Sequence, residues 1–498
     1  MNGPEQDARL LAAPAISLPM PSSATSSRPA FVRSDAADTG NKRPPITLNI
    51  PFGDANPGII EFAKGKIPGD QDAMRIVASW CVSQKEWEAL SWLCRNTTLT
   101  RLTICDTSFD DSGAQTLREI MLCDTAIKTL DLSNNLFGAG IAKAFCEGLK
   151  SNRTLTTLNF DNRMCGKYGD REFAIRLSEA LQSNTALTTI NLSIMCAVNA
   201  GASALIQALE VNKSLKNFTL LTLAVGPGVA NALSEALHAN TTLKKLHLSQ
   251  LGMEDAGAEA IASALAGNPS LESLDLGRNR FSSKGIMALV AVLKTNSTLK
   301  ELSLCGNKIS PADMEHLADA LKANTSLVSL NLDMCGAGDD GVKALTAALS
   351  GNAALVSLSV EMCGMRDDGA KAFAAALSGN TSLKAIRFGW NDISQEGAMA
   401  LLEALRSNTT LTGFSMSYPD PALQEEIAAL LERNRRIPET ISGAEAFFHL
   451  VNRTGNPDSA VLPEEVNRLI LGDLVQAPRG INTAGQMKEQ IDPPPRKS

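Results

Sequence analysis

An asparagine recurs every 28 residues through most of this 498-residue chain. The series begins at Asn96 and ends at Asn408, and only the interval from Asn152 to Asn184 is longer, at 32 residues. The other members are Asn212, Asn240, Asn268, Asn296, Asn324, Asn352 and Asn380, with Asp124 filling the one remaining position. Twelve copies at one spacing identify a solenoid, because a period in this range corresponds to one stacked supersecondary unit.

Each copy contains a strand pattern followed by a helix pattern. Residues 271–276 alternate apolar and polar side chains, as a half-buried strand does. Residues 255–265 space alanine, isoleucine and leucine by threes and fours behind an acidic residue, as an amphipathic helix does. Neither element can bury its apolar face alone. The predicted fold is therefore an α/β solenoid of about twelve strand–helix repeats, with a parallel inner sheet, outer helices and helical caps.

The pattern Leu-x-x-Leu-x-Leu-x-x-Asn, complete at 271–279 and 299–307, resembles that of leucine-rich repeats. The repeat length and the alanine-rich helical half resemble the ribonuclease-inhibitor-like class, shared by that inhibitor, NOD-like receptors and Ran GTPase-activating protein. The resemblance covers roughly residues 96–434 and implies a horseshoe that binds other macromolecules. Cys335 and Cys363 are accepted substitutes for the final asparagine, whereas Arg163, Met195, Leu223, Leu251 and Pro419 are not. We therefore expect less regular turns in the third to sixth copies.

Composition changes along the chain predict five segments. These are a disordered N-terminal segment at 1–56, a helical N-terminal cap at 57–95, the leucine-rich repeats at 96–435, a helical C-terminal cap or tail at 436–475 and a disordered C-terminus at 476–498.

Charge and hydropathy restrict the partners. A formal net charge of −7 argues against general nucleic-acid binding, which needs basic stripes. The sequence has no run of 18 apolar residues, so we expect no membrane insertion, and its start lacks the basic region of a secretory signal. Ten cysteines without paired spacing predict a reducing, cytoplasmic compartment.

The chain lacks the residue patterns of common catalytic sites. It has four histidines, no His-Glu-x-x-His motif, no phosphate-binding glycine loop and no evident base beside a serine or cysteine. Cys305, Cys335 and Cys363 come near one another in neighbouring copies, but the last two occupy the turn position and are interpreted as structural. We predict no enzyme activity, no catalytic or metal site and no cofactor.

The strand register predicts where a partner binds. The side chain between the last two leucines of each copy should face the concave side, and this column is mostly small and polar. The column two residues beyond the last leucine ends in Met334, Met362, Trp390 and Tyr418, which should stack at the strand-to-helix rim. Such residues are enriched in interfaces. The alternative is that they fill the turn core or seal the C-terminal end. The predicted partner-binding residues are Arg387, Trp390, Tyr418, Met362, Met334, Asp333, Glu361, His247 on the inner column, and Tyr168 in the four-residue insertion.

Three functions remain open at this point. The first is a non-enzymatic scaffold that binds a protein through the concave face and C-terminal rim. The second is an adaptor for a ubiquitin ligase, because Leu462-Pro-Glu-Glu-Val within 462–474 resembles the start of an F-box. The third is a GTPase activator of the Ran regulator type. Separately, the Ser- and Pro-rich start resembles type III secreted effectors that enter host cells without signal cleavage. The sequence names neither the partner nor the oligomeric state.

Overall fold

The structure is a computed structural model. It describes residues 46–50, 73–78, 84–96, 99–105, 109–123, 125–135, 139–162, 169–194, 199–222, 225–417 and 420–436. The chain divides into two units, 1–44 and 45–498. All described residues belong to the second unit, which is described here by itself.

The described strands form one parallel sheet in which β1 to β14 follow in chain order. They are β1 (Ile46–Ile50), β2 (Ala73–Ala78), β3 (Arg101–Cys105), β4 (Thr129–Asp131), β5 (Thr157–Asn162), β6 (Thr189–Ile194), β7 (Asn217–Leu221), β8 (Lys245–His247), β9 (Ser273–Asp275), β10 (Glu301–Ser303), β11 (Ser329–Asn331), β12 (Ser357–Ser359), β13 (Ala385–Arg387) and β14 (Gly413–Ser415).

Helices alternate with these strands. They are α2 (Gln84–Asn96), α3 (Asp111–Leu122), α4 (Ala139–Ser151), α5 (Gly169–Ser183), α6 (Asn199–Val211), α7 (Ala230–Ala239), α8 (Glu254–Leu265), α9 (Ser283–Leu293), α10 (Pro311–Ala323), α11 (Gly338–Leu349), α12 (Asp367–Leu377) and α13 (Gln395–Ser407), with a 3-10 turn η1 (Pro227–Val229) before α7. A further helix spans 421–436.

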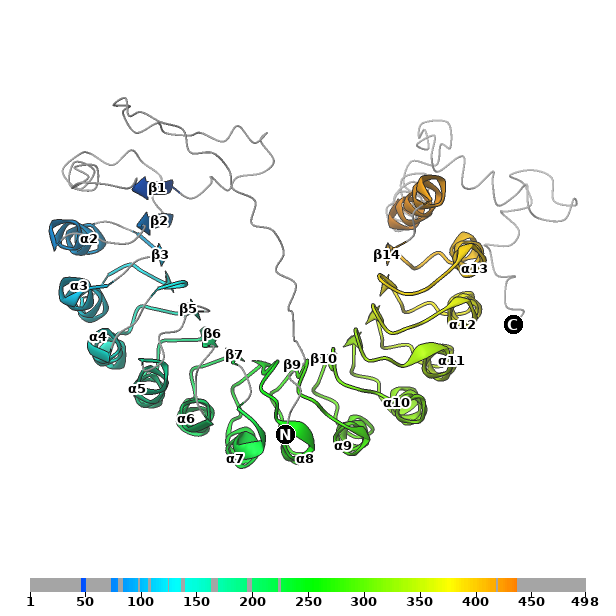
Figure 1. Ribbon diagram of the computed structural model, residues 1–498, viewed down its shortest axis with the longest axis horizontal. Coiled ribbons are helices and arrows are strands. Elements are labelled where there is room, and N and C mark those ends of the chain that lie inside the picture. Colours follow the sequence, from blue (N-terminus) through cyan, green and yellow to red (C-terminus); the bar gives the residue numbers. More distant parts are fainter. Residues whose placement is uncertain are drawn as a thin grey trace, which may run out of the picture. The chain divides into compact units, whose positions relative to one another are not determined.

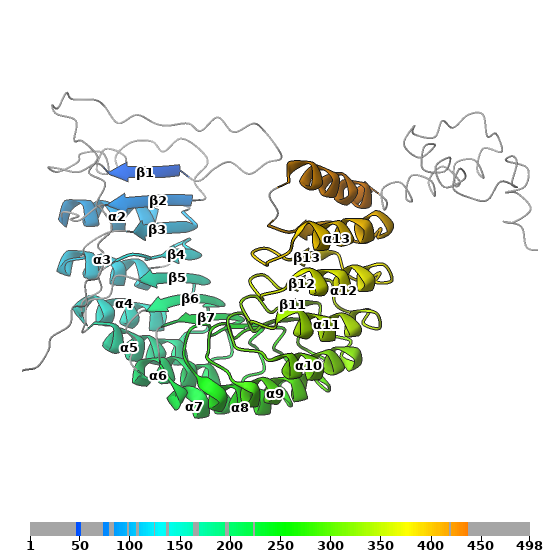
Figure 2. The ribbon, with the colours of Figure 1, turned by 45° about the vertical axis from the view of Figure 1, so that its right-hand side comes forward.

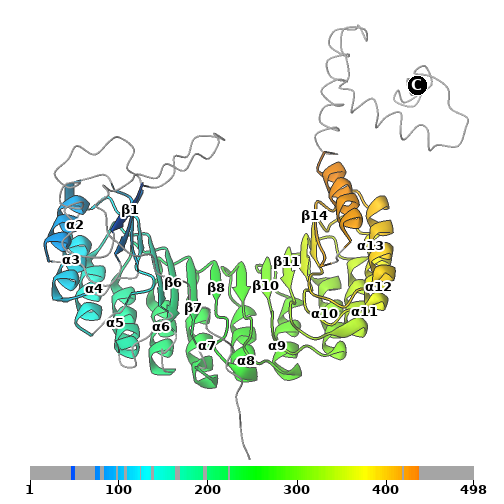
Figure 3. The ribbon, with the colours of Figure 1, turned by 45° about the horizontal axis from the view of Figure 1, so that its top comes forward.

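The strands line the inner side of the repeat array and the helices line its outer side (Figure 1). Turned views show the strands lying side by side and pointing the same way (Figures 2 and 3). The leucines of each strand and the apolar face of each helix are buried between the two layers, as at Leu246, Leu274 and Ile261. The predicted α/β solenoid is confirmed.

The sheet begins before the first predicted repeat. Strand β1 falls in the segment predicted to be disordered. Strand β2 falls in the predicted helical cap, where we expected helices such as α2 but no strand. Met74 pairs with Ile46 on one side and with Leu102 on the other, so the spacing of 28 residues continues upstream of Asn96. The sequence has Gly40 and Pro68 where asparagine would recur. The asparagine pattern therefore could not reveal these two strands.

The recurring asparagine joins each copy to the one before it. Asn240 is fully buried at the end of α7, and its Nδ2 donates to the carbonyls of Leu209 (2.7 Å) and Asn212 (3.0 Å). Its Oδ1 accepts from the amides of Thr242 (3.0 Å) and Leu243 (2.8 Å). One side chain thus satisfies four backbone groups that the helix end and the strand start would otherwise leave unpaired. This requirement explains why the residue recurs.

The acidic residues at the helix starts also act between copies. Oδ1 of Asp339, in α11, accepts from the amides of Arg366 (2.7 Å) and Gly369 (2.9 Å) at the start of α12. Asp367 makes the equivalent contacts with Ser394 and Gly397 at the start of α13. A Cβ on Gly369 would lie 2.7 Å from Oδ1 of Asp339, so a larger residue there would displace this carboxylate and glycine is favoured. Each acid caps the next helix rather than only its own.

The helix at 421–436 covers the C-terminal end of the array. Arg433 Nη2 donates to the carbonyl of Asn408 (2.7 Å), Asn434 Nδ2 to that of Leu411 (2.7 Å) and Arg435 Nη2 to that of Thr412 (2.7 Å). These bonds satisfy carbonyls that a further repeat would have satisfied, so this helix acts as a cap. The predicted segments at 436–475 and 476–498 lie, apart from residue 436, outside the described residues.

Candidate protein-binding site

Three apolar side chains stand at equivalent positions, each three residues past the end of its strand: Met334 after β11, Met362 after β12 and Trp390 after β13. We call these three residues the rim ladder. The amide of Met334 donates to the carbonyl of Glu361 (2.8 Å) and that of Met362 to the carbonyl of Gly389 (3.0 Å), which keeps the three copies in register beyond the strands. Met334 is half-buried, whereas Met362 is 47% and Trp390 71% exposed.

The rim ladder has left-handed backbone. The φ angles are 56° at Met334, 52° at Met362 and 56° at Trp390. The same column holds Gln250, Arg278 and Gly306 in earlier copies, with φ of 67°, 55° and 67°. This conformation costs residues with a Cβ roughly 1–2 kcal/mol and costs glycine nothing comparable. The turn therefore favours glycine at a column where three successive copies carry bulky apolar residues.

Arg278 extends the rim ladder toward the middle of the array. Its Nη2 lies 3.4 Å from Sδ of Met334, two copies further on. The intervening copy has Gly306, where a Cβ would lie 2.6 Å from Cγ of Arg278. Arg278 was not among the predicted site residues, although its position two residues beyond Leu276 places it in the same column.

The predicted charged residues lie on the concave side of the rim ladder. Asp333 Oδ1 accepts from the hydroxyl of Ser359 (2.5 Å) and the amide of Glu361 (2.8 Å). The carboxylate of Glu361 lies against Gly389, with Oε1 2.9 Å from the point where a Cβ would stand. Arg387 is exposed on β13. Among the described residues, neither Glu361 nor Arg387 has a side-chain hydrogen bond or ion pair.

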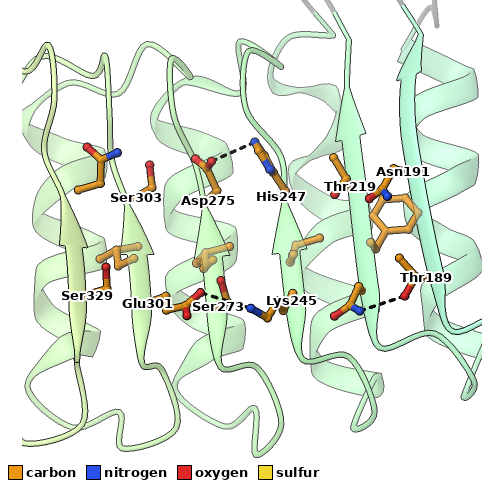
Figure 4. A pocket seen from close by; sticks show the side chains of 16 residues that line it. Thr189, Asn191, Thr219, Lys245, His247, Ser273, Asp275, Glu301, Ser303 and Ser329 are labelled. Carbon is orange, nitrogen blue, oxygen red and sulfur yellow. Dashed lines mark hydrogen bonds and ion pairs between the residues drawn. The ribbon is translucent and has the colours of Figure 1, made fainter. Parts of the chain in front are cut away.

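His247 lies elsewhere, in a hollow of about 480 Å³ on the concave face, lined by residues of β6 to β11 (Figure 4). Its Nε2 is 2.9 Å from Oδ2 of Asp275 and 2.9 Å from Oγ of Ser249. The Ser249 hydroxyl is also 2.9 Å from Oδ1 of Asp275. Burial opposes ionisation of Asp275, but the interaction with His247 and the hydrogen bonds from the Gly277 amide and the Ser249 hydroxyl together lower the pKa of this carboxyl.

The contact between His247 and Ser249 corrects the expectation that no base lies beside a serine. The two residues lie two positions apart in one copy, and only Asp275, which holds both of them, comes from the next copy. In a serine nucleophile the carboxylate holds one imidazole nitrogen while the other takes the hydroxyl proton. Here one nitrogen, Nε2, contacts both partners, and the hydroxyl also bonds the carboxylate. The geometry is that of a closed polar cluster on the concave face.

The cysteines at the turn position are in contact. Sγ of Cys335 lies 3.4 Å from Sγ of Cys363, and Cys363 Sγ lies 3.1 Å from the carbonyl of Leu332. Hydrogen bonding with Cys335 and burial raise the pKa of Cys363. Within the described ranges, His, Cys, Asp and Glu form no group of three that could hold a metal ion. Tyr168 and Tyr418 lie outside these ranges.

Family comparisons agree with the repeat geometry. A model of the TMOD/LMOD leucine-rich domain matches residues 224–309, and a leucine-rich repeat model matches 323–345, 351–374 and 379–402. The chain carries leucine-rich repeats. The ribonuclease-inhibitor-like class is compatible with this architecture. No curated protein matches this leucine-rich repeat chain significantly in sequence.

Several solved structures resemble parts of the leucine-rich repeat array. Leiomodin-1 actin-binding site 2 is 20% identical, covers 32% of this chain and 93% of its own, and has a TM-score of 0.28. The Rad7 and Elc1 complex from yeast is 17% identical, covers 66% and 79%, and scores 0.45. The tropomodulin C-terminal domain of Caenorhabditis elegans is 15% identical, covers 34% and 99%, and scores 0.29. Similarity at this level carries no inference about partners.

No helix in the described part of the chain has the length and apolar character needed to cross a membrane.

Proposed function

We propose that this protein is a non-enzymatic scaffold that binds a protein partner through the concave face and the rim ladder of its repeats. The observation that carries the proposal is the rim ladder itself. Met362 and Trp390 are bulky, apolar and exposed, and they stand in a backbone conformation that favours glycine. Folding stability alone gives no reason for these side chains, since they bury little surface and raise the energy of the turn.

Backbone strain kept without a gain in burial is typical of functional positions. The left-handed backbone is shared by Gln250 and Arg278 in earlier copies, but at three neighbouring copies it carries a bulky apolar side chain, which makes an apolar strip rather than an isolated exposed residue. Methionine and tryptophan contribute much of the energy of protein interfaces, since methionine adapts its shape and tryptophan supplies a large contact area. A partner would gain the burial that the fold leaves unused.

The polar concave face supports the same proposal. It offers donors and acceptors around the hollow, including the His247–Asp275 pair and the Lys245–Glu301 pair, whose charged atoms are 3.6 Å apart. Polar groups around an apolar contact are the usual composition of an interface rim, where they fix orientation more than affinity. The rim ladder would therefore supply most of the binding energy and the inner face the specificity.

The predicted adaptor, GTPase-activator and effector functions and the predicted location remain untested by the structure. The adaptor function depends on 462–474, which lie outside the described residues. The GTPase-activator function, the type III secreted effector role in a host cell and the cytoplasmic location have no observation in the described residues that favours them.

Glycine substitutions test the proposal without damaging the fold. The triple variant Met334→Gly, Met362→Gly, Trp390→Gly places in three copies the residue that Gly306 already provides in a fourth. Because relief of left-handed strain offsets the entropy of glycine, we expect the free energy of unfolding to stay within about 2 kcal/mol of wild type. The matched control is Gln250→Gly, which changes the same turn position in an earlier copy.

The measurement is affinity purification from eukaryotic lysate, with mass spectrometry of the recovered proteins. We expect a partner that wild type and Gln250→Gly retain and that the triple variant loses by about thirtyfold or more in affinity, which is the effect of removing a binding hot spot. Equal recovery by the folded triple variant would show that the rim ladder does not bind this partner.

A further inference from the structure

We infer that the rim ladder receives one amphipathic α-helix of the partner, with apolar residues at positions i, i+3 or i+4, and i+7 and a basic side chain directed at Glu361. This inference rests on the proposed function and specifies the partner's chemistry. Its basis is the spacing of the three side chains along the rim and the position of one carboxylate beside them.

The spacing of the rim ladder is set by the sheet. Asn331, Ser359 and Arg387 pair across β11, β12 and β13, and the hydrogen bonds of Met334 and Met362 to the next copy maintain this register at the rim. Neighbouring strands lie about 4.8 Å apart, so Met334 and Trp390 are separated by roughly 10 Å along the array.

A helix matches this distance better than a strand. Seven helical residues rise about 10.5 Å, and residues i, i+3 or i+4, and i+7 share one face, so three apolar side chains meet the three rungs in turn. In a strand, three side chains on one face lie at i, i+2 and i+4, which is four residue steps and about 13 Å, so the outer two would miss Met334 and Trp390 by roughly 3 Å in total. The flexible methionine side chains can adapt to the apolar face of a helix.

The charges beside the rim ladder indicate a basic group. The Asp333 carboxylate already accepts two hydrogen bonds, from Ser359 and from the amide of Glu361. The Glu361 carboxylate has no such partner among the described residues and lies against Gly389, the residue before Trp390. A lysine or arginine from the partner can contact this carboxylate and the indole face together.

Arg387 refines the orientation of the helix. It is exposed on β13, one column further into the concave face than Gly389, and has no ion pair among the described residues. A helix that lies along the rim would therefore place its basic side chain near Glu361 and tolerate an acidic one only on the side toward Arg387. The surface thus discriminates between the two flanks of an amphipathic helix.

The test is a display selection of random 16-residue peptides on the full-length protein, with counter-selection on Trp390→Gly. We expect enriched peptides with the helical spacing of apolar residues and with lysine or arginine beside that stripe. Synthetic copies should become helical when bound, lose at least tenfold in affinity for Trp390→Gly, and lose about threefold to tenfold for Glu361→Gln. Binding to Gln250→Gly should match that to wild type.

Enriched peptides without helical spacing, peptides that tolerate a central proline, or acidic peptides unaffected by Glu361→Gln would overturn the inference. So would the absence of any peptide that depends on Trp390. If the lysate partner still requires the rim ladder in those cases, the proposed function stands and only the helical partner is wrong. If the lysate partner is also retained by the glycine triple variant, the proposed function itself fails.

Discussion

The copies of β8 to β13 and the copies of β5 to β7 build different turns from the same repeat. Strands β9 to β11 are three residues long, and the turns after β9 and β10 are held by Asn279 and Asn307. Asn307 Nδ2 donates to the carbonyls of Leu276 (3.0 Å) and Leu304 (2.9 Å), while its Oδ1 accepts from the amides of Asn279 and Phe281. Strands β5 and β6, whose copies lack this asparagine, are six residues long, and β7 has five.

The two regions differ in where the chain leaves the sheet and in the backbone of the turn that follows. Where the asparagine is present, the chain leaves the sheet after three residues, enters left-handed backbone and presents a side chain at the rim. In the copies of β5 and β6, Phe160 and Leu192 continue the parallel pairing instead. The helix-end asparagine is kept in both regions, although the interval from Asn152 to Asn184 is four residues longer. Leu251, Cys335 and Cys363 also occupy the turn position before short turns with left-handed backbone, so an exposed rim accompanies a buried turn residue and not asparagine alone.

Loss of a helix-end asparagine should have the largest effect, and the same effect in both regions. Asn184 and Asn324 each donate to two carbonyls and accept from two amides, with Nδ2 2.7 Å from the nearer carbonyl in both. Because alanine would leave these buried groups unpaired, Asn184→Ala and Asn324→Ala should each lower the free energy of unfolding by about 3–5 kcal/mol.

Urea denaturation checks this expectation. The control is Asn191→Ala, because Asn191 is exposed and bonds only the Asn159 side chain among the described residues, and its cost should stay below about 1 kcal/mol. A cost at Asn184 that is several kcal/mol smaller than at Asn324 would mean that the two regions differ in more than their turns.

Replacement of a turn asparagine should have an intermediate effect. Asn307→Leu introduces the residue that Leu251 already provides in another copy, where the side chain is fully buried. We expect a loss of about 2–3 kcal/mol, because leucine fills the space but leaves the amides of Asn279 and Phe281 without the Oδ1 acceptor of Asn307. Hydrogen exchange should show faster exchange at the Arg278 and Gly306 amides, which donate beyond the strands. Unchanged exchange at these two amides would show that the turn asparagine does not stabilise the rim.

Removal of an acid cap should have the smallest effect and should change the response to pH. The hydroxyl of Ser394 and the amides of Ser394 and Gly397 hold the pKa of Asp367 below its ordinary value, although desolvation opposes them. A lowered folded pKa stabilises the protein above the unfolded value, about 3.9, and this stability is lost as pH falls through the folded pKa.

Asp367→Asn should therefore cost no more than about 1 kcal/mol at pH 7 and reduce the fall in Tm between pH 5 and pH 2. The control is Asp340→Asn, since Asp340 is exposed and pairs only with Lys343 among the described residues. If both variants keep the wild-type acid response, Asp367 does not contribute through its charge.

The sequence revealed the repeat because the groups that enforce it lie at fixed separations. Asn240, for example, bonds backbone 28 and 31 residues earlier and two and three residues later, and the equivalent asparagines repeat most of these bonds, so nearly every copy keeps the same residue. It could not reveal β1 and β2, which have no such asparagine at their starts. The candidate site was predicted by column, but the contact of Arg278 with Met334 and those of Asp275 with His247 and Ser249 were missed because they cross copies.

The sequence by itself determined the period, the alternation of strand and helix, and the side of the sheet on which each leucine is buried, because backbone pairing and apolar burial impose these at every copy. Only the tertiary structure decided which turn residues take left-handed backbone and how exposed Trp390 is. The reason is that the conformation of a turn depends on the buried residue at the turn position and on side chains of the neighbouring copy. The identity of the turn residue alone does not determine these contacts.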